Sequence, residues 1–80
     1  MYYVYILESQ KNGRYYVGVT DNAQRRLREH NLGLVRSTFP YKPWVLKRIE
    51  KFEDVSAAYK RERFIKDKHS RKIISKIIGS

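Results

Sequence analysis

Residues 2–20 read YYVYILESQKNGRYYVGVT, and this stretch decides the fold. Its two ends, residues 2–7 and 14–20, are rich in aromatic and β-branched residues, which favour strands. Lys11-Asn12-Gly13 lies between them, and an Asn-Gly pair in this position is typical of a tight hairpin turn. The sequence therefore predicts an antiparallel β-hairpin.

The register of this hairpin follows from the position of its turn. A turn centred on Asn12-Gly13 pairs residues whose numbers sum to 25, which puts Tyr5 opposite Thr20. Tyr5 and Tyr16 are then about four residues, or roughly 13 Å, apart along the strands, so a bulge or strong twist is needed to bring their hydroxyls together. Side chains alternate between the two faces of a sheet. The expected core face carries Val4, Ile6, Tyr15, Val17 and Val19, and the other face carries Tyr3, Tyr5, Tyr16 and Gly18.

A short helix is predicted next, over residues 23–30. Thr20-Asp21-Asn22 supplies candidates for its N-cap, and Gly33 marks its end. The spacing of Ala23, Arg26, Leu27 and His30 places these four residues on one helix face. Arg26 and His30 are therefore expected one turn apart, beside the buried residues.

The rest of the chain predicts one loop, one strand and two helices. Residues 34–43, with two prolines, indicate an irregular exposed loop, and residues 44–52 a third strand with imperfect alternation. Asp54 or Ser56 caps a helix that runs to about Lys66, and apolar pairs predict a last helix from about residue 70 to 78. We thus expect a single α+β domain over residues 1–80, with a small three-stranded antiparallel sheet flanked by three helices.

The helix that ends near Lys66 carries an unusual acid. Its predicted inward face contains Glu62 among apolar residues, namely Val55, Ala58, Tyr59 and Ile65. A carboxylate that faces inward needs a partner or a metal ion. Of the eight acidic residues, Glu62 is the one that the pattern places clearly inside, which favours a single-metal site over a paired one.

Composition narrows the choice of partner. Lys and Arg number 18 and Asp and Glu number 8, a net charge of +10, so the first expected partner is a nucleic acid. Solubility alone needs fewer charges, and an anionic membrane surface is the weaker alternative. The absence of Cys excludes disulfides, thiolate zinc sites and cysteine catalysis. No signal peptide or bilayer span is expected, which predicts a cytoplasmic protein, with a monomer as the default state.

Five residues in this order resemble the active site of the GIY-YIG endonuclease family, which includes the nuclease domain of the bacterial excision-repair incision enzyme. The first motif is Tyr3-Val4-Tyr5 and the second is Tyr16-Val17-Gly18, with Tyr5 and Tyr16 eleven positions apart. The family's arginine, its frequent histidine and its metal-binding glutamate fall on Arg26, His30 and Glu62. The resemblance covers nearly the whole chain and is closest to the short stand-alone members. The sequence departs from the family pattern in having Tyr3 for the first Gly and Val17 for Ile.

The resemblance implies a DNA endonuclease that uses one Mg²⁺ or Mn²⁺ ion, in DNA repair or processing. The resemblance implies that Tyr5 and Tyr16 together provide the general base for the attacking water and help to position it. Tyr16 is the first choice for the general base. A free phenol has a pKa of about 10, so it needs a neighbouring cation to act as a base near pH 7. Arg26 stabilises the charge on the phosphate, His30 orients a tyrosine, and Glu62 binds the metal ion.

Other interpretations remain open. The tyrosines also fit ordinary strand aromatics, and Arg26 fits a phosphate clamp without catalysis. His30 also fits a charged side chain at a helix C-terminus. Glu62 fits a salt-bridge partner of Lys66, and the rest of residues 60–63 fits a phosphate-contacting surface. The alternative function is accordingly a non-catalytic nucleic-acid-binding module on the same scaffold.

Overall fold

The computed structural model describes residues 1–68 and 70–79, and it confirms the α+β fold. Three strands and three α-helices occur in the predicted order, with one 3-10 turn, η1, before the third strand. The elements are β1 (Tyr2–Ser9), β2 (Tyr15–Thr20), α1 (Ala23–Asn31), η1 (Phe39–Tyr41), β3 (Trp44–Phe52), α2 (Val55–Lys66) and α3 (Arg71–Gly79).

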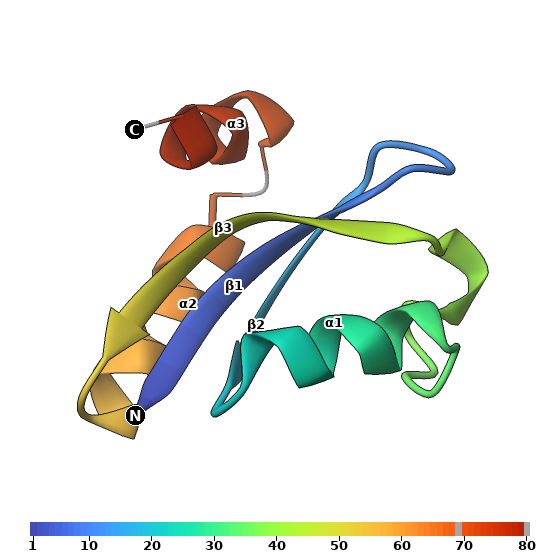
Figure 1. The fold of residues 1–80 in the computed structure, drawn as a ribbon. Coiled ribbons are helices and arrows are strands. Elements are labelled where there is room, and N and C mark those ends of the chain that lie inside the picture. Colours follow the sequence, from blue (N-terminus) through green and yellow to red (C-terminus); the bar gives the residue numbers. More distant parts are fainter. Residues whose placement is uncertain (69, 80) are drawn as a thin grey trace.

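The sheet has the strand order β2-β1-β3, and both pairings are antiparallel. The central strand β1 lies between helices on both sides, with α1 against one face and α2 and α3 against the other (Figure 1). One apolar cluster joins the sheet to α2 and α3 and includes Val4, Ile6, Val17, Ala58, Ile65 and Ile74. A second cluster lies under α1 and includes Tyr5, Leu7 and Trp44, with Tyr16 and Leu27 against it.

These clusters confirm how the hairpin side chains are sorted between the two faces. The second face is not open, however, because α1 and the segment before β3 cover it. Tyr5 is only 2% exposed there. The Tyr5 hydroxyl therefore lies inside the molecule, where an unpaired polar group is costly.

The predicted hairpin register is wrong by two residues. Tyr5 faces Gly18 rather than Thr20. The strands are joined by a loop of Gln10 to Gly13, not by a two-residue turn, because the Ser9 hydroxyl accepts hydrogen bonds from the backbone N–H groups of Lys11 and Asn12 at 3.1 and 3.2 Å. A shift of two residues keeps every side chain on its face, since the strand period is two. Tyr16 is therefore only two positions along β2 from Gly18, the residue opposite Tyr5.

The third strand contains a bulge that explains its imperfect alternation. Ile6 of β1 pairs with Arg48, whereas the next residue, Leu7, pairs with Leu46. Lys47 is therefore the extra residue on β3, and such an insertion bends a strand and resets which residues face the core. Trp44 at the start of β3 is buried, and it packs in the same cluster as Tyr5.

Helix α1 is fixed at both ends by the predicted residues and is one residue longer than expected. Asn22 caps it by accepting a hydrogen bond from the Arg25 N–H at 3.0 Å. At the other end Gly33 has φ of 80°, and the backbone N–H of Leu34 donates to the carbonyl of Glu29. This left-handed glycine cap ends the helix just after His30. It holds His30 on the last turn, facing the sheet.

Three expectations for the second half of the chain need correction. Tyr59 does not face inward: it is 55% exposed on α2. The segment 34–43 is not wholly exposed, because Thr38 within it is buried. Glu62 is not the only acid turned inward, because Glu50 of β3 is held by Arg48 at 2.7 Å and by Arg61 of α2 at 2.8 Å. Asp54 caps α2 as predicted.

None of the helices in the described ranges 1–68 and 70–79 is long and apolar enough to span a membrane.

Candidate active site

The site begins with a hydrogen bond between β1 and α1. The Tyr5 hydroxyl and Nε2 of His30 are 3.0 Å apart, and both residues are buried. His30 reaches Tyr5 because it lies on the last turn of α1, on the face that covers the sheet. The predicted pairing of His30 with a tyrosine therefore has a geometric basis, and the tyrosine concerned is Tyr5.

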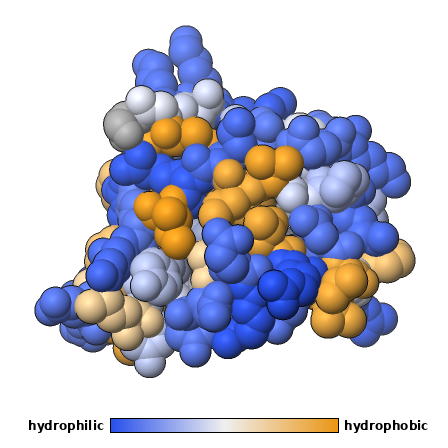
Figure 2. All heavy atoms as spheres, in the orientation of Figure 1, coloured by the Kyte–Doolittle hydropathy of each residue, from blue (hydrophilic) through white to orange (hydrophobic). Residues whose placement is uncertain are grey.

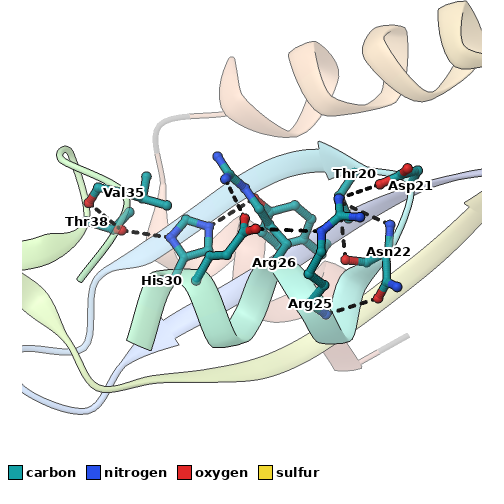
Figure 3. Close-up of polar contacts among 10 residues, drawn as sticks. Thr20, Asp21, Asn22, Arg25, Arg26, His30, Val35 and Thr38 are labelled. Carbon is teal, nitrogen blue, oxygen red and sulfur yellow. Dashed lines mark hydrogen bonds and ion pairs between the residues drawn. The ribbon is translucent and has the colours of Figure 1, made fainter. Parts of the chain in front are cut away.

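No sequence pattern indicated the residue on the other side of His30. Its Nδ1 lies 2.7 Å from Oγ1 of Thr38, which is 1% exposed (Figure 3). The Thr38 hydroxyl in turn donates to the Val35 carbonyl at 3.3 Å. Thr38 belongs to the segment expected to be an exposed loop. No local pattern distinguishes it, since its partner is eight positions away.

Burial and charge shift the pKa values of this pair in opposite directions. Burial raises the pKa of Tyr5 to about 12, and a hydrogen bond from Arg26 opposes that rise. Burial lowers the pKa of His30 to about 4, and the charge of Arg26 adds to the effect. At neutral pH Tyr5 is therefore a protonated phenol and His30 a neutral imidazole.

Tyr16 packs against both members of the pair. Its ring centre lies 6.2 Å from that of Tyr5 and 5.0 Å from that of His30. It is less buried than Tyr5, because β2 is an edge strand of the sheet. Nζ of Lys66, from α2, lies 5.9 Å from the centre of the Tyr16 ring. Tyr16 is thus the tyrosine nearer to the solvent and has a cation beside it.

Arg26 extends from α1 toward the same place and remains partly accessible. Its guanidinium donates to Glu29 at 2.9 Å, and its side chain is 34% exposed. It also forms the hydrogen bond that opposes the rise in the pKa of Tyr5. Arg26 lines a surface hollow of about 320 Å³ together with Arg25, Thr20 and Tyr59. The Arg25 guanidinium forms an ion pair with the Asp21 carboxylate at 2.6 Å (Figure 3).

Glu62 lies in an adjacent hollow of about 310 Å³, which it lines with Tyr59, Lys60 and Arg63. Tyr59 borders both hollows, so Arg26 and Glu62 lie on either side of one exposed aromatic ring. The Glu62 carboxylate is paired with Lys66 at 3.4 Å. Its charge is close enough to contribute to the raised pKa of Tyr5. All five predicted residues therefore come together in one region, with Glu62 at its edge.

The basic run 60–63 does not form one uniform surface. Lys60 and Arg63 border the hollow of Glu62, whereas Arg61 makes two hydrogen bonds to Glu50 at 2.8 and 3.0 Å on the core side of α2. These bonds hold the Arg61 guanidinium against Glu50, which does not favour a phosphate contact for Arg61. The face seen in Figure 2 is largely hydrophilic, with apolar side chains in smaller patches, as a net charge of +10 requires.

Tyr3, which replaces the first glycine of the family pattern, lies outside this region. It is half-buried and lines a third hollow of about 370 Å³ with Asp21, Gln24 and Ile49. Tyr3 therefore faces a different hollow from the ones that Arg26 and Glu62 line.

Comparisons with known proteins agree with the sequence and the fold. Residues 1–75 match the GIY-YIG catalytic domain family. A UPF0213 protein of Halobacterium salinarum is 40% identical over 67 residues, which cover 82% of this chain and 86% of the relative. The solution NMR structure of a UPF0213 protein from Bacillus halodurans has a TM-score of 0.62 and 30% identity, over 99% of this chain and 84% of that one.

The fold and the match over residues 1–75 define a catalytic domain of nuclease type. The chain belongs to the GIY-YIG family, and its relatives are UPF0213 proteins, which form a short GIY-YIG family. The resemblance drawn from the two tyrosine motifs is thereby confirmed.

Proposed function

We propose that this protein is a divalent-metal-dependent endonuclease that hydrolyses DNA phosphodiester bonds, in DNA repair or processing. One observation carries the proposal: Tyr5, Tyr16 and His30 pack together, and Arg26 and Glu62, from α1 and α2, border two neighbouring hollows that share Tyr59. The net charge of +10 suits a phosphate backbone as the partner.

The two tyrosines take different roles in this proposal. Tyr5 is buried, its pKa is raised to about 12, and it is bonded to His30, so it keeps its proton and positions other groups. Tyr16 is more accessible, and Nζ of Lys66 lies 5.9 Å from the centre of its ring. We therefore assign Tyr16 the role of general base toward the attacking water.

Arg26 is the residue that stabilises the transition state. A guanidinium can donate two parallel hydrogen bonds to phosphate oxygens, which a lysine cannot do. Arg26 borders the hollow of about 320 Å³, and its guanidinium is paired with Glu29 at 2.9 Å, which favours one orientation before substrate binds. Preorganised donors of this kind act on the charge that develops on the five-coordinate phosphate.

The residues present fit a single Mg²⁺ or Mn²⁺ ion held by Glu62. Mg²⁺ is commonly bound by one or two carboxylates together with substrate phosphates and water. The Glu62 carboxylate borders an open hollow, and its partner Lys66 is an exposed, displaceable cation. No cluster of three or more potential ligand side chains occurs among the described residues, so substrate would complete the coordination. When bound, the ion supplies positive charge to a non-bridging phosphate oxygen and the leaving group.

The test uses the full chain with supercoiled, nicked and branched DNA in Mg²⁺ or Mn²⁺. We expect cleavage by the wild type, loss of cleavage but retained binding in Glu62→Gln, and unchanged cleavage in the control Glu53→Gln, which alters an exposed acid. Binding without cleavage of any substrate would instead support the alternative, a nucleic-acid-binding module. In both cases binding should weaken steeply with added salt, and an affinity that salt does not change would contradict both functions.

A further inference from the structure

A continuous hydrogen-bonded chain crosses the buried side of the site. It starts at the Tyr5 hydroxyl, which lies near enough to the Arg26 guanidinium for that group to oppose the rise in the Tyr5 pKa. It continues from Tyr5 to Nε2 of His30 at 3.0 Å, and from Nδ1 of His30 to Oγ1 of Thr38 at 2.7 Å. It ends where the Thr38 hydroxyl meets the Val35 carbonyl at 3.3 Å (Figure 3). Three of its members can both donate and accept: the two hydroxyls and the imidazole.

The Val35 end of the chain determines its direction. A backbone carbonyl can only accept, so the Thr38 hydroxyl uses its hydrogen on Val35 and accepts from His30. If every member donates to the next, the Tyr5 O–H donates to Nε2, the Nδ1–H donates to Thr38, and the Thr38 O–H donates to Val35. Every hydrogen in this arrangement has an acceptor.

The reverse arrangement leaves a buried hydrogen unsatisfied. If Thr38 donated to Nδ1, the proton of His30 would be on Nε2, and the Tyr5 oxygen would face two donors, Arg26 and the imidazole. The Tyr5 hydrogen would then point away from His30, its one hydrogen-bond partner among the described residues that can accept it, in a side chain only 2% exposed. Leaving a buried hydroxyl hydrogen unsatisfied is costly, which favours the first direction.

We propose that Thr38 is a positioning residue: its hydroxyl holds His30 as the Nδ1–H tautomer and thereby directs the Tyr5 proton toward His30 and the Tyr5 lone pair toward Arg26. The consequence for catalysis rests on the proposed function, whereas the tautomer itself does not. A histidine's second nitrogen commonly fixes the tautomer of the first in this way.

The surroundings hold Thr38 in place for this role. The indole N–H of Trp44 donates to the Thr38 carbonyl at 3.1 Å, and the backbone N–H of Tyr41 donates to the same carbonyl at 3.1 Å. Thr38 and His30 are 1% and 0% exposed, so bulk water does not compete for these hydrogen bonds. The lowered pKa of His30 agrees with a neutral ring that has one N–H.

The chain also gives Arg26 a fixed neighbour. With the Tyr5 hydrogen directed inward, the phenol oxygen accepts from the guanidinium and limits its movement. Loss of the Thr38 hydroxyl would let His30 change its tautomer and the Tyr5 hydroxyl turn, so Arg26 would move more freely. No group that touches the substrate would be removed.

The test is the protonation state of each His30 nitrogen at pH 7, read from long-range ¹H–¹⁵N correlation spectra of the full chain. The chain has two histidines, so His30→Gln identifies the His30 signals. We expect a protonated Nδ1 and a bare Nε2 in the wild type and in Thr38→Ser, which keeps the hydroxyl. Thr38→Val keeps the shape without the hydroxyl and should move the proton to Nε2.

The activity measurement is separate. Outer partners of functional histidines contribute about 10- to 100-fold, so Thr38→Val should slow cleavage by that factor while Thr38→Ser stays close to the wild type. A wild type with Nε2 protonated, or a Thr38→Val protein with an unchanged tautomer, overturns the inference. If Thr38→Val does not fold, the wild-type and Thr38→Ser spectra still decide it. A wild type with the expected tautomer that cleaves no DNA contradicts the proposed function and leaves the role of Thr38 in setting the tautomer intact.

Discussion

The phenol of Tyr5 lies directly across Gly18 of the neighbouring strand. The two residues are partners in the β1–β2 register, and a Cβ added at Gly18 would lie 2.5 Å from the Tyr5 hydroxyl oxygen and 2.6 Å from Cζ. The glycine of the second motif is thus needed to make room for the tyrosine of the first. The same cross-strand pair places the Tyr5 hydroxyl where it meets His30.

Gly18→Ala should therefore destabilise the protein and displace Tyr5. The new methyl group meets a ring that is buried and bonded to His30, so the free energy of unfolding should fall by about 1 to 3 kcal/mol, as for other overpacked sites. Gly79→Ala is the matched control, because a Cβ there meets nothing within 4 Å. Chemical denaturation measures both, and equal stability of the two variants would contradict the close contact.

Stability should depend on pH through His30. The pKa of His30 is lowered to about 4 in the folded protein, against about 6.5 in an unfolded chain. Below pH 6.5 the unfolded chain binds a proton that the folded protein does not, so the free energy of unfolding should fall between about pH 6.5 and 4, by up to about 3 kcal/mol.

His30→Gln should remove this part of the pH dependence. Acids with lowered pKa values, such as Glu50 and Asp54, contribute to stability in the wild type and in His30→Gln alike, and this contribution is lost at lower pH in both. The difference between the two curves of unfolding free energy against pH therefore isolates His30. Urea denaturation at several pH values gives the curves. Parallel curves over this window would show that His30 titrates normally.

The two tyrosines should differ when each loses its hydroxyl. Tyr5→Phe leaves Nε2 of His30 without its donor in a buried site, so we expect a loss of about 1 to 3 kcal/mol in the free energy of unfolding. Tyr16→Phe keeps the ring contacts and should lower the cleavage rate by about 100-fold or more, since a general base contributes at least that factor. Tyr15→Phe, on the opposite face, is the control. Cleavage that survives in Tyr16→Phe but not in Tyr5→Phe would reverse the two roles.

Substitution of Arg61 should affect mainly stability, whereas substitution of Arg63, two positions further along α2, should affect mainly DNA binding. Arg61→Ala removes two hydrogen bonds to the partly buried Glu50, so it should cost about 1 to 3 kcal/mol of stability and leave the affinity of the folded protein for DNA nearly unchanged. Arg63→Ala should leave stability unchanged, weaken DNA binding, and reduce the salt slope by about 1. Thermal unfolding and binding titrations at several salt concentrations measure these effects. A weakened salt slope in Arg61→Ala would contradict its assignment to the core side.

Local patterns were sufficient wherever a short-range rule applies. Helices α1 and α2 begin at Asn22 and Asp54 because these side chains satisfy nearby backbone N–H groups. The register of the hairpin was predicted wrongly, but the face of each side chain was predicted correctly. Side chains alternate with a period of two, so a shift of two residues leaves each side chain on its face. The order and spacing of the two tyrosine motifs, Arg26, His30 and Glu62 likewise identified the family.

Long-range contacts decided what the sequence did not show. The Ser9 hydroxyl, which accepts from the N–H groups of the hairpin loop, is buried and donates to the carbonyl of Tyr41, 32 positions away, and no strand pattern reveals that contact. Glu50 is turned inward because Arg61, from another element, meets it across the core.

The sequence by itself determined the family and the elements on which the five candidate site residues lie, because motif spacing, periodicity and capping act over a few residues. Only the tertiary structure decided that Tyr5 is bonded to His30, that Thr38 completes the buried chain, and that Glu62 is paired with Lys66. The physical reason is that burial and hydrogen-bond partners, and the pKa values they set, depend on which distant segments come together in space.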